Sequence, residues 1–264
     1  MSYQYTIFVL RLQCRKAVMY KISIRNFIKE LDSFFAKEDL QGAEQCALKW
    51  LELAREHGDK PAELTIYNEM TGFYRQTGNA EKGLEAVSKA FSLLDEFDSD
   101  WRTRGVIYLN GATTMKAFGK SAEAMEYYEK AENYFKDMLD KNDPLWAGFY
   151  NNKALALQDL KRYDEAEEYF LKAIEFTENS EKNELETAIS LDNLAHLYYE
   201  INSEGERINP LLDRALDILD CPDYFGYMKY AFTCRKCAPS FGFFGFFLAE
   251  KRLNERADRI YAGN

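Results

Sequence analysis

Apolar and small residues recur along this chain with a period of about 41–42 residues, a length typical of repeat architectures. One series is Tyr67, Tyr108, Tyr150 and Leu191. Three further series keep a nearly constant offset from it: Thr71, Ala112, Ala154 and Ala195; Tyr74, Met115, Leu157 and Tyr198; and Ala90, Ala131, Ala173 and Ala215. A fixed period of this size predicts stacked supersecondary units, each packed on its neighbours, rather than one globular core.

Within one period, the apolar positions predict two amphipathic helices separated by a tight turn. In residues 62–76 the apolar side chains follow 3-4 spacing, and residues 80–97 continue as a second helix. Gly78 between them suits the left-handed position that ends a helix. An earlier pair within residues 24–57 and a last pair within residues 222–264, whose register the pattern leaves uncertain, flank the clear repeats.

The repeat pattern therefore predicts an all-α fold with about six helical pairs. The small residues that recur at fixed offsets allow two helices to cross closely, because larger side chains would push their axes apart, and aromatic side chains fill the spaces between neighbouring pairs. Only five prolines and 14 glycines occur in the chain, which favours helix throughout. We expect an N-terminal extension over residues 1–21, one solenoid domain over residues 22–264, and capping helices over residues 222–264.

The repeated segments resemble the tetratricopeptide repeat. The best matches are residues 191–198, with the sequence Leu-Asp-Asn-Leu-Ala-His-Leu-Tyr, and residues 150–174. The long period, with Asn-Asn or Asp-Asn before the small residue, is similar to the kinesin-light-chain-like subclass; bacterial peptide-sensing regulators also use long units, and we expect a bacterial source. The resemblance implies a right-handed α-α superhelix that binds peptides or proteins along a concave face lined by the first helix of each pair.

Asparagines are the most regular candidates for that face. Asn110, Asn152 and Asn193 share one offset, and an asparagine amide can pair with a peptide backbone whatever its sequence. Alternatively, these side chains bond to neighbouring helices and fix the stacking of the repeats. We expect Asn68 and Asn151 to be exposed in the groove. The full set of candidate groove residues is Asn68, Arg75, Leu109, Asn110, Lys116, Asn151, Asn152, Leu155, Asn193, His196 and Tyr199.

Three apolar members of this set, Leu109, Leu155 and Tyr199, are expected to anchor a ligand. The first two also stand where some family members carry polar residues that clamp a C-terminal carboxylate. Recognition of an acidic C-terminal tail is therefore not expected.

Charge and hydropathy limit the class of partner. The net charge is −10, so the chain gains nothing from phosphate neutralisation, and nucleic acid is not an expected partner. The negative charge is concentrated between residues 31 and 228, which indicates either a solvated outer face or steering of a basic partner. No apolar run approaches the roughly 18–20 residues that span a bilayer, so no membrane association is expected. Five cysteines without a secretory signal indicate reduced thiols in a cytoplasmic protein.

Candidate chemistry is sparse. Cys234 and Cys237 form a C-x-x-C motif, but a zinc site needs a second pair of ligands, and a redox motif needs a helix N-terminus after a strand. The only histidines, His57 and His196, lie in no nucleophile or metal spacing. We therefore predict no catalytic residue, no metal site and no cofactor. The aromatic cluster over residues 241–247 indicates either an exposed docking patch or the closed end of the solenoid.

These observations predict a scaffold that binds a peptide or protein through its concave groove. The alternative is a regulatory sensor, in which a bound peptide alters a partner protein. An enzyme is the third alternative and would require a role for His196. Association of two copies through the terminal helices also stays open.

Overall fold

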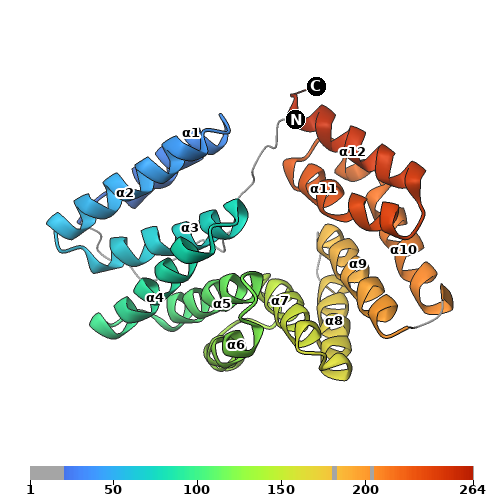
Figure 1. Ribbon diagram of the computed structural model, residues 1–264, viewed down its shortest axis with the longest axis horizontal. Helices are drawn as coiled ribbons and strands as arrows, with labels where there is room; N and C mark the ends of the chain where they lie inside the picture. The colour runs from blue at the N-terminus through green and yellow to red at the C-terminus, as the bar shows by residue number, and fades with distance from the viewer. Residues whose placement is uncertain (1–20, 180–182, 203–204, 264) are drawn as a thin grey trace. The chain divides into compact units, whose positions relative to one another are not determined.

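The computed structural model describes residues 21–179, 183–202 and 205–263, and every regular element in these ranges is a helix (Figure 1). The all-α prediction is thereby confirmed, with twelve α-helices in the described part of the chain. The chain divides between Asp140 and Lys141 into two compact units, and each unit is described by itself below. The expected N-terminal extension lies outside the described residues except for Lys21.

The first unit holds three helical pairs in the described residues. Its helices begin at side chains that suit the N-cap position, since Asp39, Asp59 and Asn79 accept hydrogen bonds from the first turns that follow them. The helices are α1 (Ile24–Phe35), α2 (Leu40–Glu56), α3 (Lys60–Thr77), α4 (Ala80–Glu96), α5 (Trp101–Ala117) and α6 (Ser121–Lys136).

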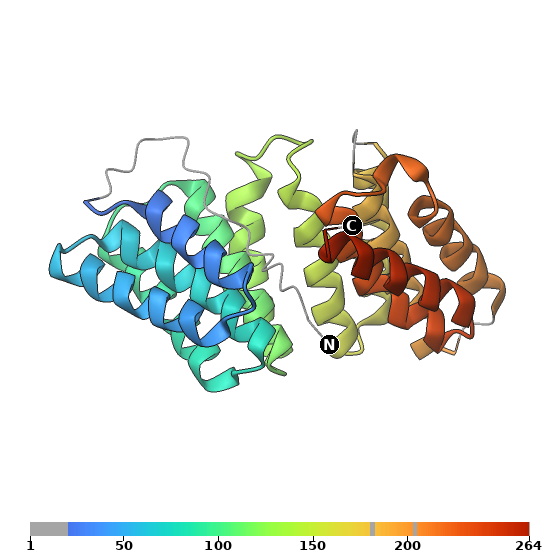
Figure 2. The same ribbon diagram turned by 90° about the horizontal axis from the view of Figure 1, so that it is seen from above.

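The second unit repeats the same architecture. Its helices are α7 (Leu145–Asp159), α8 (Tyr163–Glu178), α9 (Glu184–Glu200), α10 (Gly205–Leu219), the short 3-10 helix η1 (Pro222–Tyr224), α11 (Met228–Phe243) and α12 (Phe247–Tyr261). In both views α11 and α12 lie side by side, and they pack against each other (Figures 1 and 2). Pro239 does not end the first helix of this last pair, since α11 continues through it for another turn.

The turn between paired helices keeps its backbone conformation through all four clear repeats. Gly78, Gly119, Lys161 and Asn202 have positive φ values of 72°, 76°, 58° and 56°. They follow one another along the chain at the period read from the sequence. Glycine adopts this conformation without steric cost, whereas Lys161 adopts it because the flanking helices fix the turn.

The small residues of the repeat lie where the helices pack most closely. Ala90, Ala131, Ala173 and Ala215 are all buried, and aromatic rings such as Phe135 and Phe170 fill the spaces beside them. A fully buried phenylalanine of this kind contributes roughly 1.5–3 kcal/mol relative to an exposed one. The core of each unit is therefore a continuous stack of helical pairs.

A carboxylate on the second helix of a pair also joins it to the next pair. In the first unit, Glu44 accepts hydrogen bonds from the Tyr74 hydroxyl at 2.8 Å and from Lys82 at 2.7 Å. In the second unit, Glu167 accepts from the Tyr198 hydroxyl at 2.7 Å and from Arg207 at 2.6 Å. The same contact thus recurs in both units at one offset of the repeat.

Candidate functional site

Two members of the predicted asparagine row, Asn110 and Asn193, bond to asparagines of the preceding first helix. Asn110 Nδ2 on α5 donates to Asn68 Oδ1 on α3 at 2.8 Å, and Asn193 Nδ2 on α9 donates to Asn151 Oδ1 on α7 at 3.3 Å. Asn151 Nδ2 donates in turn to Ser190 Oγ at 2.8 Å. The two members of each asparagine pair lie one period apart in the sequence, so the amides link one repeat to the next.

The expectation that Asn68 and Asn151 are exposed is wrong. Their exposed fractions are 1% and 8%, because each amide faces the next first helix and the two helices close over the bond. The geometry supports the alternative in which asparagines fix the stacking of the repeats. Leu109 is also fully buried, so it is not an exposed apolar anchor.

Two basic candidates lie at the end of the first helices of the first unit. Arg75 is half-buried, and its Nη1 donates to Thr114 Oγ1 on α5 at 3.3 Å. Burial lowers the pKa of this guanidinium from its ordinary value. Lys116 on α5 is half-buried as well. Arg75 therefore joins two helices in addition to any contact with a ligand.

The remaining candidates belong to the second unit. Asn152 and Leu155 on α7 and Asn193 and His196 on α9 are half-buried, whereas Tyr199 on α9 is 54% exposed. Tyr199 is the most accessible large side chain of the predicted set. Among the surfaces that contain predicted groove residues, the one around Tyr199 is consequently the best candidate for a binding site.

Aromatic side chains of α9 and of the C-terminal end of α11 meet at this surface, which we call the α9–α11 aromatic face: His196, Tyr199, Phe243 and the C-cap residue Phe244. The Tyr199 ring lies 4.9 Å from that of Phe243, edge to face, and the His196 ring lies 5.0 Å from that of Phe244. Phe243 is 56% exposed, whereas Phe241 two residues earlier is fully buried. The aromatic cluster over residues 241–247 therefore both closes the core and presents rings to solvent, so each of the two interpretations holds for part of it.

A polar relay lies beneath this face. Ser240 Oγ on α11 donates to Asp192 Oδ2 on α9 at 2.9 Å and lies 2.9 Å from His196 Nε2. Burial raises the pKa of Asp192 to about 7 and lowers the pKa of His196. The serine stands between the carboxylate and the imidazole, so the carboxylate does not orient the histidine as it does in a Ser-His-Asp triad. The relay ties α11 to α9.

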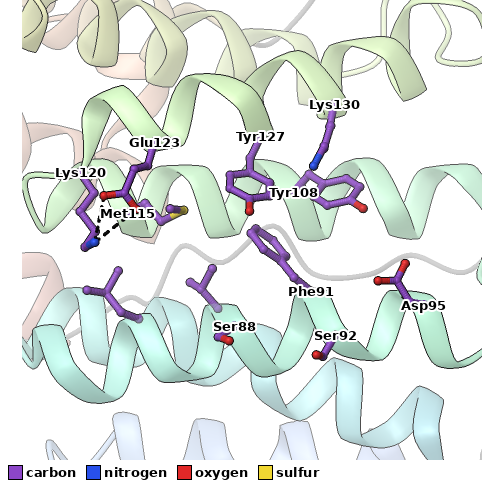
Figure 3. Close-up of a pocket in the computed structure, with 12 residues that line it drawn as sticks. Ser88, Phe91, Ser92, Asp95, Tyr108, Met115, Lys120, Glu123, Tyr127 and Lys130 are labelled. Carbon is purple, nitrogen blue, oxygen red and sulfur yellow. Dashed lines mark hydrogen bonds and ion pairs between the residues drawn. The ribbon is translucent and has the colours of Figure 1, made fainter.

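A groove that the sequence did not predict lies in the first unit, between α4 and α6 with α5 as its floor (Figure 3). Its volume is about 490 Å³. The rings of Phe91 and Tyr127 stack at 4.4 Å, and Tyr108 lies 6.0 Å from Tyr127. Lys130 Nζ lies 4.7 Å from the centre of the Tyr127 ring. The sequence feature that could have indicated this groove is the set of aromatic residues on the second helices. The repeat pattern, however, assigns these residues to packing between helical pairs.

Three of the cysteines lack the properties of a reactive or metal-binding site. Cys46, Cys234 and Cys237 are buried, and burial raises the pKa of the first two thiols to about 11 and that of Cys237 well above its ordinary value. A thiol must be deprotonated to act as a nucleophile or a ligand. Within the part of the chain that the structure describes, no cluster of three or more His, Cys, Asp or Glu side chains is arranged to hold a metal ion.

Sequence comparisons agree with the repeat pattern. A family model described as "Tetratricopeptide repeat" matches residues 147–219. The curated "Clustered mitochondria protein homolog" of Aspergillus niger is 28% identical over 126 residues, which is 45% of this chain and 10% of that protein. The chain thus spans about a tenth of the length of this relative. These curated relatives are fungal, and the expected bacterial source stays a prediction.

Structural comparisons show the fold. The chain is similar to a "putative kinesin light chain nearly identical TPR-like repeats" structure from Podosopora anserina, with a TM-score of 0.53 and 18% identity, covering 77% of this chain and 97% of that one. It is also similar to a STAND protein "with a tetratricopeptide repeat sensor" from Pyrococcus horikoshii. That match has a TM-score of 0.62 and 18% identity over 90% of this chain and 36% of that one. The resemblance to long tetratricopeptide repeats is therefore confirmed for the fold.

The helices of the described ranges are amphipathic or interrupted by charged residues. None of them combines the length and the apolar character that crossing a bilayer requires.

Proposed function

We propose that this chain is a protein-interaction scaffold and that a peptide or protein segment binds to the α9–α11 aromatic face. The observation that carries the proposal is the exposure of Tyr199 and Phe243, which pack edge to face while more than half of each side chain stays accessible. Rings fixed by each other lose little conformational entropy when a ligand covers them, and such rings dominate the energy of many interfaces.

The fold and the comparisons support an interaction role in general terms. Stacked helical pairs offer a long surface for other chains, and the family model that matches residues 147–219 is described as a tetratricopeptide repeat. Asn152 on α7 and Asn193 on α9 are half-buried, and an asparagine amide can pair with a ligand backbone. The same proposal includes a concave peptide-binding groove, the groove candidates that are not buried, and a cytoplasmic location. No observation favours the sensor over the scaffold.

Site-specific photocrosslinking tests this surface directly. A photoreactive phenylalanine analogue replaces Tyr199 in the full chain, and a matched control places it at Lys251, an exposed residue of α12. We expect Tyr199 to yield a defined crosslinked partner in a lysate that Lys251 does not yield. Phe243→Ser should abolish that adduct while the far-UV circular dichroism and melting temperature stay close to those of the parent chain.

The same adducts at Tyr199 and Lys251, or an adduct at Tyr199 that survives Phe243→Ser in a folded protein, would contradict the proposal. Mass spectrometry of the crosslinked peptide then identifies the segment that binds.

A further inference from the structure

The polar relay beneath the α9–α11 aromatic face joins a buried carboxyl to an imidazole of that face. Asp192 is 5% exposed, and its Oδ2 lies 2.9 Å from Ser240 Oγ on α11. Ser240 Oγ also lies 2.9 Å from Nε2 of His196, whose half-buried ring contacts Phe243 and Phe244. A change at the carboxyl can therefore reach the aromatic face through two hydrogen bonds.

The single proton of the Ser240 hydroxyl fixes the direction of both hydrogen bonds at once. An ionised carboxylate only accepts, so Ser240 donates to Asp192 Oδ2 when the carboxyl has lost its proton. The Ser240 oxygen then accepts from His196, so Nε2 carries the imidazole proton. In this state Nδ1 is the unprotonated nitrogen of the ring and acts as a hydrogen-bond acceptor.

Protonation of the carboxyl reverses both hydrogen bonds. The added proton needs an acceptor, and within the described ranges Ser240 Oγ is the only partner of the Asp192 side chain, whose Oδ1 is buried without one. An unpaired buried donor is unfavourable, so the carboxyl donates to Ser240, and Ser240 donates to an unprotonated His196 Nε2. One proton from solvent accounts for the change: it binds Nδ1, the Nε2 proton passes to Ser240, and the Ser240 proton passes to Asp192. The imidazole is neutral before and after.

The Nδ1 atom of His196 is the end of the relay that reaches solvent. Within the described part of the chain it makes no hydrogen bond, and it is not one of the buried polar atoms that lack a partner there. The atom therefore lies at the accessible edge of the half-buried ring.

We propose that Asp192 acts through Ser240 as a proton-controlled switch on the α9–α11 aromatic face: His196 Nδ1 accepts a hydrogen bond when the carboxyl is ionised and donates one when it is protonated. A ligand group at this point is then an N–H in the first state and a carbonyl in the second. The use of Nδ1 by a ligand rests on the proposed function of this face, whereas the switch itself belongs to the free chain.

The switch works near neutral pH. Burial raises the pKa of Asp192 to about 7, although the Ser240 hydrogen bond and the Lys236 ammonium on α11 lower it. Burial also lowers the pKa of His196 from its ordinary value, so the ring stays neutral while Asp192 takes up its proton. The pKa of the buried Cys237 thiol on α11 lies well above its ordinary value, so this neighbour stays protonated throughout.

The other charged groups around α9 are held by partners of their own. Glu186 on α9 pairs with Lys229 on α11 at 3.3 Å. Lys153 on α7 donates to a tyrosine hydroxyl of α8 at 2.7 Å, and Glu167 on α8 pairs with Arg207 on α10 at 2.6 Å. The proton on Asp192 is therefore the change of charge that the relay transmits.

Nitrogen-15 NMR of the full chain, labelled in its histidines, tests the switch without any ligand. The chain has two histidines, and His57→Gln assigns the signals of His196. We expect the proton of the neutral His196 ring on Nε2 at pH 8.5 and on Nδ1 at pH 6, with a midpoint at about pH 7. The same protonated nitrogen at both pH values, or two protonated ring nitrogens below this midpoint, would overturn the proposal.

Variants of the relay locate the control at the carboxyl and the hydroxyl. Asp192→Asn does not titrate, so the position of the His196 proton should no longer change near pH 7, and Ser240→Ala should have the same effect because it removes the connecting hydroxyl. The matched control is Ser190→Ala, which removes a buried hydroxyl of α9 that bonds to Asn151 and should preserve the exchange. If Ser240→Ala fails to fold, Asp192→Asn still decides, since an exchange that persists in it would refute the relay.

Acylation by diethyl pyrocarbonate, which attacks an accessible and unprotonated imidazole nitrogen, tests whether Nδ1 faces solvent. With a pKa of about 7, about a tenth of the Asp192 carboxyls stay ionised at pH 6. His196 should therefore react about tenfold more slowly at pH 6 than at pH 8.5, because the unprotonated nitrogen at pH 6 is Nε2, which Ser240 covers.

The same reaction in Asp192→Asn should differ by no more than about twofold between the two pH values. Equal rates in the parent chain would contradict the proposal, since Nδ1 would not be the accessible acceptor. A chain that shows the exchange and the tenfold change in rate, but forms no specific adduct at Tyr199, would support the switch and contradict the proposed function alone.

Discussion

The two units place the same side chain at the same repeat offset but leave it in different states. Tyr127 of the first unit corresponds to Tyr169 of the second, one period later. The Tyr169 hydroxyl accepts a hydrogen bond from Lys153 Nζ at 2.7 Å, and Lys153 is buried. The residue one period before Lys153 is Gly111, which leaves the Tyr127 hydroxyl open. One side chain on the first helix thus decides whether a repeated ring position completes the packing or lines a groove.

The links between first helices differ between the units in a similar way. Asn68 of the first unit and Asp192 of the second occupy the same offset, and each accepts a hydrogen bond from a first helix further along the chain. The amide is neutral at every pH, whereas the carboxylate titrates. The same position in the repeat therefore gives a link that is independent of pH in one unit and dependent on pH in the other.

The largest expected effect follows from this contrast. Burial raises the pKa of Asp192 from 3.8 to about 7 in the folded protein. The folded state therefore favours the protonated carboxyl, and the resulting stabilisation is complete below pH 4 and is lost as the pH rises through about 7. Full linkage corresponds to at most about 4 kcal/mol. Asp192→Asn should accordingly be more stable than the parent chain at pH 8.5, and this advantage should disappear near pH 4.

Urea unfolding of both proteins at the two pH values measures this effect. His196 has a lowered pKa and destabilises the fold as the pH falls, so its contribution is absent from the comparison of the two proteins at pH 8.5. Asn68→Asp should introduce the opposite change in the first unit, with a loss of stability at pH 8.5. A difference between Asp192→Asn and the parent that stays constant with pH would exclude the linkage.

The next largest effect tests how much the lysine contributes to the second unit. Lys153→Ala removes the donor to Tyr169 and the stem that packs over the Phe149 and Tyr169 rings, so we expect a loss of about 2–3 kcal/mol. Lys153→Met keeps the apolar stem and should recover about half of that loss. Gly111→Ala should change stability by less than about 1 kcal/mol, because a gain in helix propensity offsets the displaced Phe91 ring. Chemical denaturation gives all three values; equal losses for Lys153→Ala and Gly111→Ala would remove the contrast.

The asparagine links give a smaller difference. Asn151 has three partners, Ala147 O, Ser190 Oγ and Asn193 Nδ2, whereas Nδ2 of Asn68 has no partner among the described residues. Asn151→Ala should therefore lower the free energy of unfolding by about 2 kcal/mol, and Asn68→Ala should lower it by about 1 kcal/mol. Thermal melts of the two variants compare them directly. A larger loss for Asn68→Ala would show that the links do not differ as their hydrogen bonds indicate.

The fold was predictable because period, helix pattern and turn geometry all agree. Gly78 has the positive φ expected where its helix ends, and the turns of the following repeats share this conformation even where Lys161 replaces glycine. The first helix of the last pair was less predictable, because Pro239 favours a helix end locally and packing on α9 and α12 carries α11 past it.

The candidate site was predictable only in part. Periodicity placed Asn151 and Tyr199 on the first helices, but it could not distinguish an amide that faces solvent from one that faces the next helix. That difference depends on a small rotation about the helix axis, and the packing of the neighbouring helix sets this rotation. The groove between α4 and α6 depends on the absence of a side chain at Gly111, and an absence has no periodic signal.

The smallest expected effect is the sharpest test of the comparison between the units. Tyr169→Phe leaves the buried Lys153 ammonium without one of its acceptors, so we expect a loss of about 1 kcal/mol. Tyr127→Phe removes a hydroxyl that bonds to no described residue, so its stability should stay within about 0.3 kcal/mol of the parent chain. Duplicate urea titrations with a shared baseline resolve this difference. If Tyr127→Phe destabilises the protein as much as Tyr169→Phe, the Tyr127 hydroxyl has a structural partner. The repeated tyrosine then completes the packing in the first unit as it does in the second.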